Sequence, residues 1–277
     1  MPSIDLHKTL IIQTLIENKD SEKWEKLFEI NKKILNHFGY ENIYLLRAKP
    51  QIVISEKYHG FQRAELFLYQ DMEILKNYDY VIYTEIDAFL IKPIDEFQKL
   101  CDGVKEEAIM FSDYEEIIRR QHPKIMFCLF SVKFYKKFLS YFRKEFEIIK
   151  KIGHEKYKNH CIDMFPRCII CCALDEDLIW SNIIKKHKLK EIVNLDCISP
   201  NKKEHLKYFV NSRFTDSELV RSWPEKIFPD DKKIEYSLEI ILNQIFFLHV
   251  LEIEHDENNF FFEYLKENIE IDDLFKI

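Results

Sequence analysis

Two acidic residues, Glu85 and Asp87, stand one residue apart directly after a continuous apolar run, Tyr80 to Thr84. In an extended segment alternate side chains point to the same side, so both carboxylates can reach one ion. Carboxylate oxygens are ligands that Mg²⁺ and Mn²⁺ prefer, and these ions commonly bridge to phosphates. A buried acid pair is costly unless it binds a positive group. The pattern therefore predicts a divalent cation site.

The acidic pair is expected at the carboxyl end of a buried parallel strand. Residues 8–15 and 42–46 are rich in β-branched and apolar residues and predict two strands, with an amphipathic helix over residues 21–37 between them. This β-α-β unit indicates a parallel sheet with a right-handed crossover. Residues 80–84 predict a third strand of the same sheet. Ligands of such sheets bind beyond the carboxyl ends of the strands.

The remaining sequence continues the alternation of helices and strands, and one mixed α/β domain over residues 1–277 is the simplest interpretation. Two stretches predict no regular structure: residues 154–166, a loop, and residues 199–232, a polar excursion expected to order over a ligand. Helices are predicted at residues 60–76, 94–100, 134–151, the later half of 172–186, and 258–270, and strands at residues 107–111, 124–132, 191–195 and 244–251.

The amino-acid composition limits how this chain could bind phosphate groups and which partners it could have. The chain has 277 residues, of which 47% are apolar and 32% charged, as expected of a globular protein. Only four glycines occur, which excludes the Gly-rich phosphate loops. Phosphate binding must then use a metal ion, Arg or Lys, or a helix N-terminus. The net charge of −7, with basic residues spread along the sequence, argues against nucleic acid as a partner.

Four of the seven cysteines, Cys161, Cys168, Cys171 and Cys172, lie close together. Their spacing leaves a structural metal or redox role open. The favoured interpretation is a buried apolar segment in which cysteine acts as a small hydrophobe.

The expected cellular location is based on the N-terminal sequence and on the length of the apolar runs. No basic segment followed by an apolar stretch opens the sequence, and no run reaches the roughly 18 apolar residues of a membrane span. We expect a cytoplasmic protein. Peripheral contact with the inner face of a membrane that carries a lipid-linked acceptor stays open as an alternative.

The segment Tyr80 to Pro93, with its acidic Glu85-Ile86-Asp87, resembles the D-x-D segment of GT-A-fold glycosyltransferases. The resemblance implies a GT-A-like, Rossmann-like α/β domain with a mixed, mostly parallel central sheet flanked by helices. Residues 1 to about 105 would bind the nucleotide sugar, and about 106–277 would form the acceptor side and a C-terminal helix. Glu85 and Asp87 would hold a divalent metal, Mn²⁺ or Mg²⁺, and the sugar nucleotide. Glu85 departs from the family pattern by one additional methylene.

Three shorter segments extend the resemblance. Arg63 lies on the helix before the acidic pair, where the family often has an Arg that faces the donor. The segment Asp175-Glu176-Asp177 resembles an acidic motif whose last residue acts as general base, which implies catalytic roles for Asp177 and its neighbour Glu176. Phe246 to His249 resembles the C-terminal strand whose His completes the metal shell.

Each of these residues also has a purely structural interpretation. Asp87 fits a turn or cap, and Glu85 a solvated carboxylate at the end of a strand. His249 lies between apolar neighbours and fits a hydrogen-bonded core histidine. The acidic residues 175–177 fit the first turn of a helix, where negative charge is favourable. Arg63 fits a surface ion pair with a nearby Glu.

The predicted function is transfer of a sugar from a nucleotide-sugar donor to a hydroxyl acceptor, in surface glycan synthesis. A nucleotidyltransferase or other nucleotide-sugar enzyme is one alternative, although the Gly-rich N-terminal loop usual in such enzymes is missing. A non-catalytic binding or assembly module on the same fold is the other. The sequence leaves open the donor, the acceptor, the stereochemical outcome and the oligomeric state.

Overall fold

The computed structural model describes residues 5–17, 21–49, 59–86, 88–101, 106–112, 127–164, 176–196, 209–212 and 247–250. For some residues within these ranges only the backbone is described. After a 3₁₀ turn, Leu6–Lys8, the chain forms β1 (Thr9–Ile16), α1 (Ser21–His37) and β2 (Ile43–Ala48). Strands β1 and β2 are parallel, which confirms the predicted β-α-β unit.

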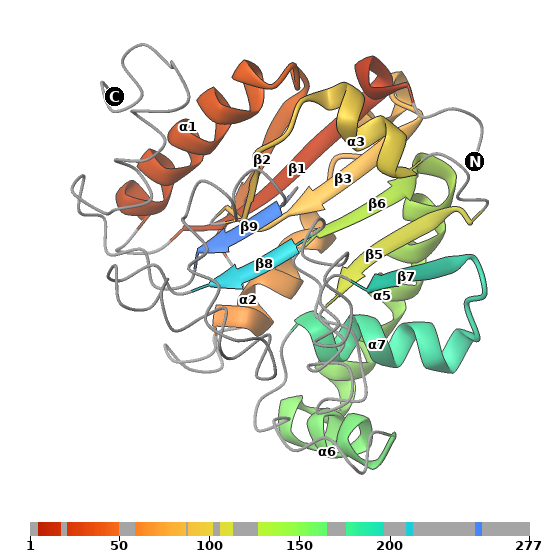
Figure 1. Ribbon diagram of the computed structural model, residues 1–277. Helices are drawn as coiled ribbons and strands as arrows, with labels where there is room; N and C mark the ends of the chain where they lie inside the picture. The colour runs from red at the N-terminus through yellow and green to blue at the C-terminus, as the bar shows by residue number, and fades with distance from the viewer. Residues whose placement is uncertain are drawn as a thin grey trace, which may run out of the picture.

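A six-stranded sheet forms the centre of the molecule (Figure 1). Its order is β2-β1-β3-β6-β5-β7, where β3 is Tyr80–Thr84, β5 is Ala108–Ser112, β6 is Phe127–Ser131 and β7 is Ile192–Asp196. Only β6 runs against the others. The α/β class with a mixed, mostly parallel central sheet flanked by helices is therefore confirmed. Both predicted halves of the chain contribute strands, and the division near residue 105 stays a prediction.

The two faces of this sheet are covered by different helices, because strand side chains alternate between faces. Helices α1 and α3 (Ile94–Cys101) cover one face, and α2 (His59–Leu66), α5 (Val132–Ile152) and α7 (Glu176–His187) cover the other (Figure 1). The main core cluster joins the second set to alternate strand residues, which are Leu10, Ile12, Val81, Tyr83, Ala108, Met110, Cys128 and Phe130. Alternate residues of a strand therefore pack against different sets of helices.

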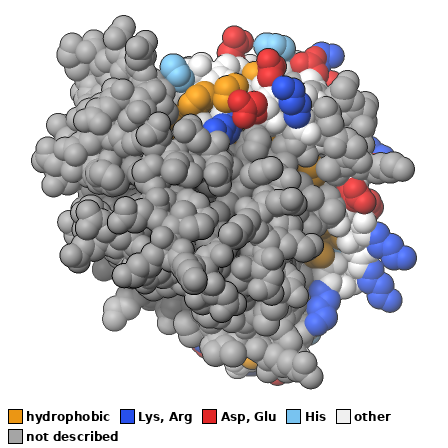
Figure 2. Space-filling view, in the orientation of Figure 1, with side chains coloured by type: hydrophobic (Ala, Val, Ile, Leu, Met, Phe, Trp, Pro, Cys, Tyr) orange, Lys and Arg blue, Asp and Glu red, His pale blue; other side chains and the backbone are white. Residues whose placement is uncertain are grey.

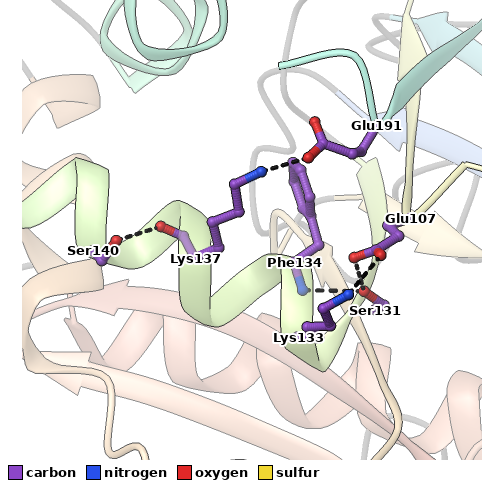
Figure 3. A network of polar contacts seen from close by, with 7 residues as sticks. All are labelled: Glu107, Ser131, Lys133, Phe134, Lys137, Ser140 and Glu191. Atoms are coloured by element: carbon purple, nitrogen blue, oxygen red, sulfur yellow. Dashed lines mark hydrogen bonds and ion pairs between the residues drawn. The ribbon is translucent and has the colours of Figure 1, made fainter. Parts of the chain in front are cut away.

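Helix α5 begins directly at the end of β6. The Ser131 hydroxyl oxygen accepts a hydrogen bond from the Phe134 N–H at 3.1 Å and so caps the first turn (Figure 3). Two lysines of α5 then pair with the acids that directly precede β5 and β7, Lys133 with Glu107 at 3.2 Å and Lys137 with Glu191. The Glu191 carboxylate raises the pKa of Lys137, and the Lys137 ammonium lowers that of Glu191.

Two predicted segments differ from the structure. The helix expected over residues 60–76 ends at Leu66 and continues as 3₁₀ turns, Phe67–Tyr69 and Ile74–Asn77. Between these turns the Asp71 carboxylate accepts a hydrogen bond from the Glu73 N–H at 2.8 Å, a local bond that competes with the helix. The prediction of a loop over residues 154–166 was wrong, because His154–Met164 forms the helix α6.

Helix α6 forms because packing overrides its weak sequence pattern. Gly153, at φ +85°, ends α5 and lets the chain turn back. Tyr157 and Cys161, one helical turn apart, are then fully buried in the main core cluster. Burial raises the pKa of Cys161 to about 12, so this thiol stays neutral, as expected of a small hydrophobe. Cys168, Cys171 and Cys172 lie outside the described residues.

A buried polar network joins α5, α6 and α7. Glu145 is 2% exposed, and its carboxylate accepts a hydrogen bond from the Tyr157 hydroxyl at 2.8 Å. Lys186 on α7 approaches the other carboxylate oxygen at 2.6 Å. The Asn182 amide donates to the Tyr157 hydroxyl at 2.7 Å. The buried charge of Glu145 is therefore matched by one cation and several hydrogen bonds, as such groups require.

Replacing Lys186 with Met is expected to lower the free energy of unfolding by about 1–3 kcal/mol, because Glu145 loses its counter-charge while staying buried. Urea denaturation measures this loss. Lys156→Met is the matched control, since Lys156 is exposed on α6, one of the helices that the network joins, and we expect a change within about 0.5 kcal/mol. Equal effects of the two substitutions would contradict the network's importance.

A small second sheet lies beside the first. Its order is β4-β9-β8, where β4 is Ala88–Leu90, β8 is Phe209–Ser212 and β9 is Phe247–Val250. Strand β8 falls within the predicted polar excursion, and the remainder of that excursion and the predicted helix 258–270 lie outside the described residues. Because β4 directly follows the acidic segment after β3, this sheet brings the C-terminal part of the chain to that segment.

The surface carries charges of both signs at the upper edge of the face in Figure 2, whereas Lys and Arg side chains gather at the right-hand edge, where α7 leads into β7. Among the described residues, no helix combines the length and the apolar character that crossing a membrane requires.

Candidate active site

The acidic segment is a tight turn between the two sheets. All five residues of β3 are buried, and so are Glu85 and Ile86, which follow it. The Ala88 N–H donates to the Glu85 carbonyl oxygen at 3.0 Å and closes the turn before β4 begins. Asp87 itself lies outside the described residues, although the residues on both sides of it are described.

Three buried polar side chains hold the carbonyl oxygens of this turn. Gln13 on β1 donates from Nε2 to the Glu85 carbonyl at 3.2 Å. Asn31 on α1 donates from Nδ2 to the Ile86 carbonyl at 2.9 Å and to the Ala88 carbonyl at 3.0 Å. The Thr84 hydroxyl lies 3.2 Å from both the Glu85 and the Ala88 carbonyl oxygens. The turn is therefore fixed from β1, from α1 and from β3 itself.

Glu85 is paired with Arg63. The Glu85 Oε1 atom lies 2.8 Å from Arg63 Nη1, and the two side chains are 7% and 32% exposed. Glu85 has the strand parity of Val81 and Tyr83, so it faces α2, which carries Arg63. The alternative interpretation of Glu85 as a solvated carboxylate at the end of a strand is therefore wrong, because Glu85 is buried. Arg63 does pair with a nearby Glu, but this Glu is buried, so the pair is not the surface pair that the sequence left open, and it involves the first acid of the predicted site.

His249 is brought next to the acidic turn by the pairing of β4 with β9. In that antiparallel ladder, Ala88 is the register partner of His249. On the other side of β9, Asn211 of β8 pairs with His249 in parallel. The backbone of His249 thus lies directly beside the residue that follows Asp87, and the side chain of His249 is outside the described part of the structure.

Glu176 and Asp177 are the first two residues of α7. Their side chains are not among those described, so both the catalytic role and the acidic first turn remain predictions. The helix is anchored one turn later by Trp180, which is fully buried and whose ring centroid lies 5.8 Å from that of Tyr83. Because Tyr83 lies two residues before Glu85, α7 packs on the sheet face that Glu85 and Arg63 share.

The predicted cation ligands lie partly outside the described residues. Among the side chains that the structure describes, no three His, Cys, Asp or Glu residues gather into a ligand set. Asp87 and the side chain of His249 are not among these described side chains. Beyond the turn, burial lowers the pKa of Lys92, an effect that the nearby Glu96 opposes. Lys92 belongs to the segment on which the resemblance was based.

Sequence reasoning missed Gln13, Asn31 and Thr84. Each is buried to 1% exposure or less, and each is polar among mostly apolar buried neighbours in its strand or helix. That contrast was the available signal: a polar residue at a position where the periodicity predicts an apolar one requires a buried hydrogen-bond partner.

No protein-family model and no curated protein sequence matches this chain. Among solved structures, a glycosyltransferase involved in the glycosylation of the major capsid of PBCV-1 aligns at 14% identity and a TM-score of 0.48, over 87% of this chain and 92% of that one. Mouse xyloside xylosyltransferase 1 aligns at 8% identity and 0.44, over 87% and 97%. The galactosyltransferase LgtC aligns at 9% and 0.43, over 93% and 94%. Likeness at this level assigns neither a family nor an activity.

Proposed function

We propose that this chain is a metal-dependent glycosyltransferase that moves a sugar from a nucleotide-sugar donor to a hydroxyl of a glycan acceptor. The observation that carries the proposal is the register of β4 with β9, which sets the backbone of His249 beside the acidic turn. In this proposal, two carboxylates and one imidazole from distant parts of the sequence act at one site. Surface glycan synthesis is the biological setting that we propose for it.

Glu85, Asp87 and His249 are the residues that would hold Mn²⁺ or Mg²⁺. Oxygen ligands from two carboxylates and a nitrogen from one imidazole form a donor set that suits these ions. A turn whose carbonyls are already hydrogen-bonded offers ligands with little freedom to lose on binding. The chemistry that the bound ion supplies is neutralisation of the charge on the departing diphosphate.

Arg63 and Asp177 have separate roles in this proposal. Arg63 is partly exposed while its guanidinium contacts Glu85, and in this proposal its guanidinium also faces the donor. If the transfer inverts the configuration, the Asp177 carboxylate accepts the proton of the attacking hydroxyl, and Glu176 lies beside it. Most of the rate enhancement would then come from positioning and charge stabilisation.

A non-catalytic binding module is the second candidate. The pair of Arg63 with Glu85 favours it, because the buried carboxylate already has a positive partner within the chain. In that case the acidic turn would hold the fold together without any cation.

Thermal unfolding with Mn²⁺ and a panel of nucleotide sugars separates the two candidates. A donor present at 100 times its Kd stabilises the folded state by about 2.7 kcal/mol through mass action. For a chain of this size that corresponds to a rise in Tm of about 5–10 °C. We expect such a rise for at least one donor, lost when EDTA replaces Mn²⁺. A panel without any shift in the presence of Mn²⁺ would leave the non-catalytic module as the better account.

A further inference from the structure

We infer that Asn31 is a positioning residue for the proposed cation site, acting through the backbone of the acidic turn together with Gln13 and Thr84. The inference rests on the proposed function. It assigns a role to residues of β1, α1 and β3 that lie behind the turn and need not touch a cation or a substrate.

The Asn31 amide group spans the position of Asp87. Its Nδ2 atom donates to the carbonyl oxygens of Ile86 and Ala88, at 2.9 and 3.0 Å. These are the residues immediately before and after Asp87. An amide group has two N–H donors in a fixed geometry, so both are used in holding the main chain on the two sides of one residue.

The neighbouring Glu85 carbonyl is fixed in the same manner. It accepts from Gln13 Nε2 at 3.2 Å and from the Ala88 N–H at 3.0 Å, and the Thr84 hydroxyl lies 3.2 Å from it. The carbonyl oxygens of Glu85, Ile86 and Ala88 thus have side-chain donors from β1, α1 and β3. A tight turn outside a functional site is usually satisfied by its own backbone bond and by water.

The hydrogen bonds of Asn31 and Gln13 to the turn leave polar atoms buried without partners among the described residues, which indicates a role beyond packing. Asn31 and Gln13 are both 0% exposed, and their amide oxygens have no hydrogen-bond partner among the described residues. A buried acceptor without a partner destabilises a protein. Retaining two such acceptors behind one turn is understandable if the geometry of that turn matters for binding, because groups behind metal ligands commonly set the ligands' orientation.

Asn31→Leu tests the inference, since leucine keeps the approximate volume and removes both donors. We expect the affinity for Mn²⁺ to fall by about 10-fold or more, in the range usual for loss of an outer-shell partner. The measurement is a titration of free Mn²⁺ by electron paramagnetic resonance, in the presence of a nucleoside diphosphate and independent of turnover.

Asn182→Leu is the matched control. Asn182 is also 0% exposed, and its amide donates to the Tyr157 hydroxyl in the network of α5, α6 and α7. We expect a similar fall in Tm with unchanged Mn²⁺ affinity. If Asn31→Leu does not fold, Thr84→Val is the second variant, because it keeps the side-chain shape and removes the hydroxyl beside the Glu85 and Ala88 carbonyls. Its expected loss of affinity is about three-fold or more.

The outcomes separate this inference from the proposed function. If the unaltered chain binds Mn²⁺ and the folded Asn31→Leu or Thr84→Val variant binds it equally well, the inference is overturned and the proposed function stands. An equal loss of affinity in Asn182→Leu would overturn it too, since the effect would then be general destabilisation. If the unaltered chain binds no Mn²⁺ even with a nucleoside diphosphate, the proposed function fails and the inference fails with it.

Discussion

Asp87→Ala is expected to abolish Mn²⁺-dependent binding of the sugar nucleotide while the metal-free protein keeps its fold. Loss of an outer-shell partner already weakens metal affinity by 10- to 100-fold, so loss of a direct carboxylate ligand should weaken it by about 100-fold or more. The neighbouring Ile86 and Ala88 are held by their carbonyls from Asn31, and these bonds involve no atom of the Asp87 side chain. The Tm without metal should therefore change little. Calorimetric titration of Mn²⁺ and donor measures the loss.

Asp79→Ala is the control for that experiment. Asp79 precedes β3 at the end opposite to the acidic turn and makes an exposed ion pair with Lys8 at 3.7 Å. Removing an exposed pair of this kind costs about 0–1 kcal/mol. Donor and Mn²⁺ binding should match the unaltered protein. Unchanged binding in Asp87→Ala would contradict the assignment of Asp87 as a ligand.

Trp180→Ala is expected to cause the largest loss of stability, a fall of about 3–5 kcal/mol in the free energy of unfolding. Trp180 is fully buried on α7 and lies in edge or tilted contact with five aromatic rings. These rings come from the turn after α2, from β3, β6 and α5, and belong to Phe67, Tyr83, Phe130, Phe138 and Phe142. Removing the indole leaves a cavity where α7 meets the sheet.

Urea denaturation measures this fall, and Trp24→Ala provides the comparison. Trp24 is only partly buried, on α1, so its removal should cost clearly less. Because α7 begins at Glu176 and Asp177, a displaced α7 should also reduce any transfer activity in conditions where the variant stays folded. A loss below about 1 kcal/mol for Trp180→Ala would contradict the central place of this residue in the core.

Much of the fold could be predicted because periodicity in the sequence reflects burial. Residues 8–15, 42–46 and 80–84 are apolar enough to be recognised as strands, and β1, β2 and β3 lie there. Helix α6 could not be predicted, because its sequence pattern is weak. Among its described side chains the buried apolar ones are Tyr157 and Cys161, and the helix packs on α5 and α7. The predicted helix is also interrupted around Asp71, where a local hydrogen bond to the Glu73 N–H forms that a helical pattern does not reveal.

The candidate site was predictable only where its chemistry lies within one segment. Glu85 and Asp87 stand out because charge follows an apolar strand. The pair of Arg63 with Glu85 depends on how α2 packs on the sheet, and sequence spacing does not define that packing. Asn31 and Gln13 act through main-chain carbonyls, which leave no residue pattern at the turn itself. The roles of Asp177, Glu176 and His249 stay predictions.

The most direct test of the proposed transfer is release of nucleoside diphosphate from common sugar nucleotides, measured chromatographically with and without Mn²⁺. If a cation held at the end of β3 activates the diphosphate as a leaving group, at least one donor should be slowly hydrolysed with Mn²⁺, and neither EDTA-treated protein nor Asp87→Ala should do so. Absence of hydrolysis and of binding for every donor, in folded protein supplied with Mn²⁺, would contradict it.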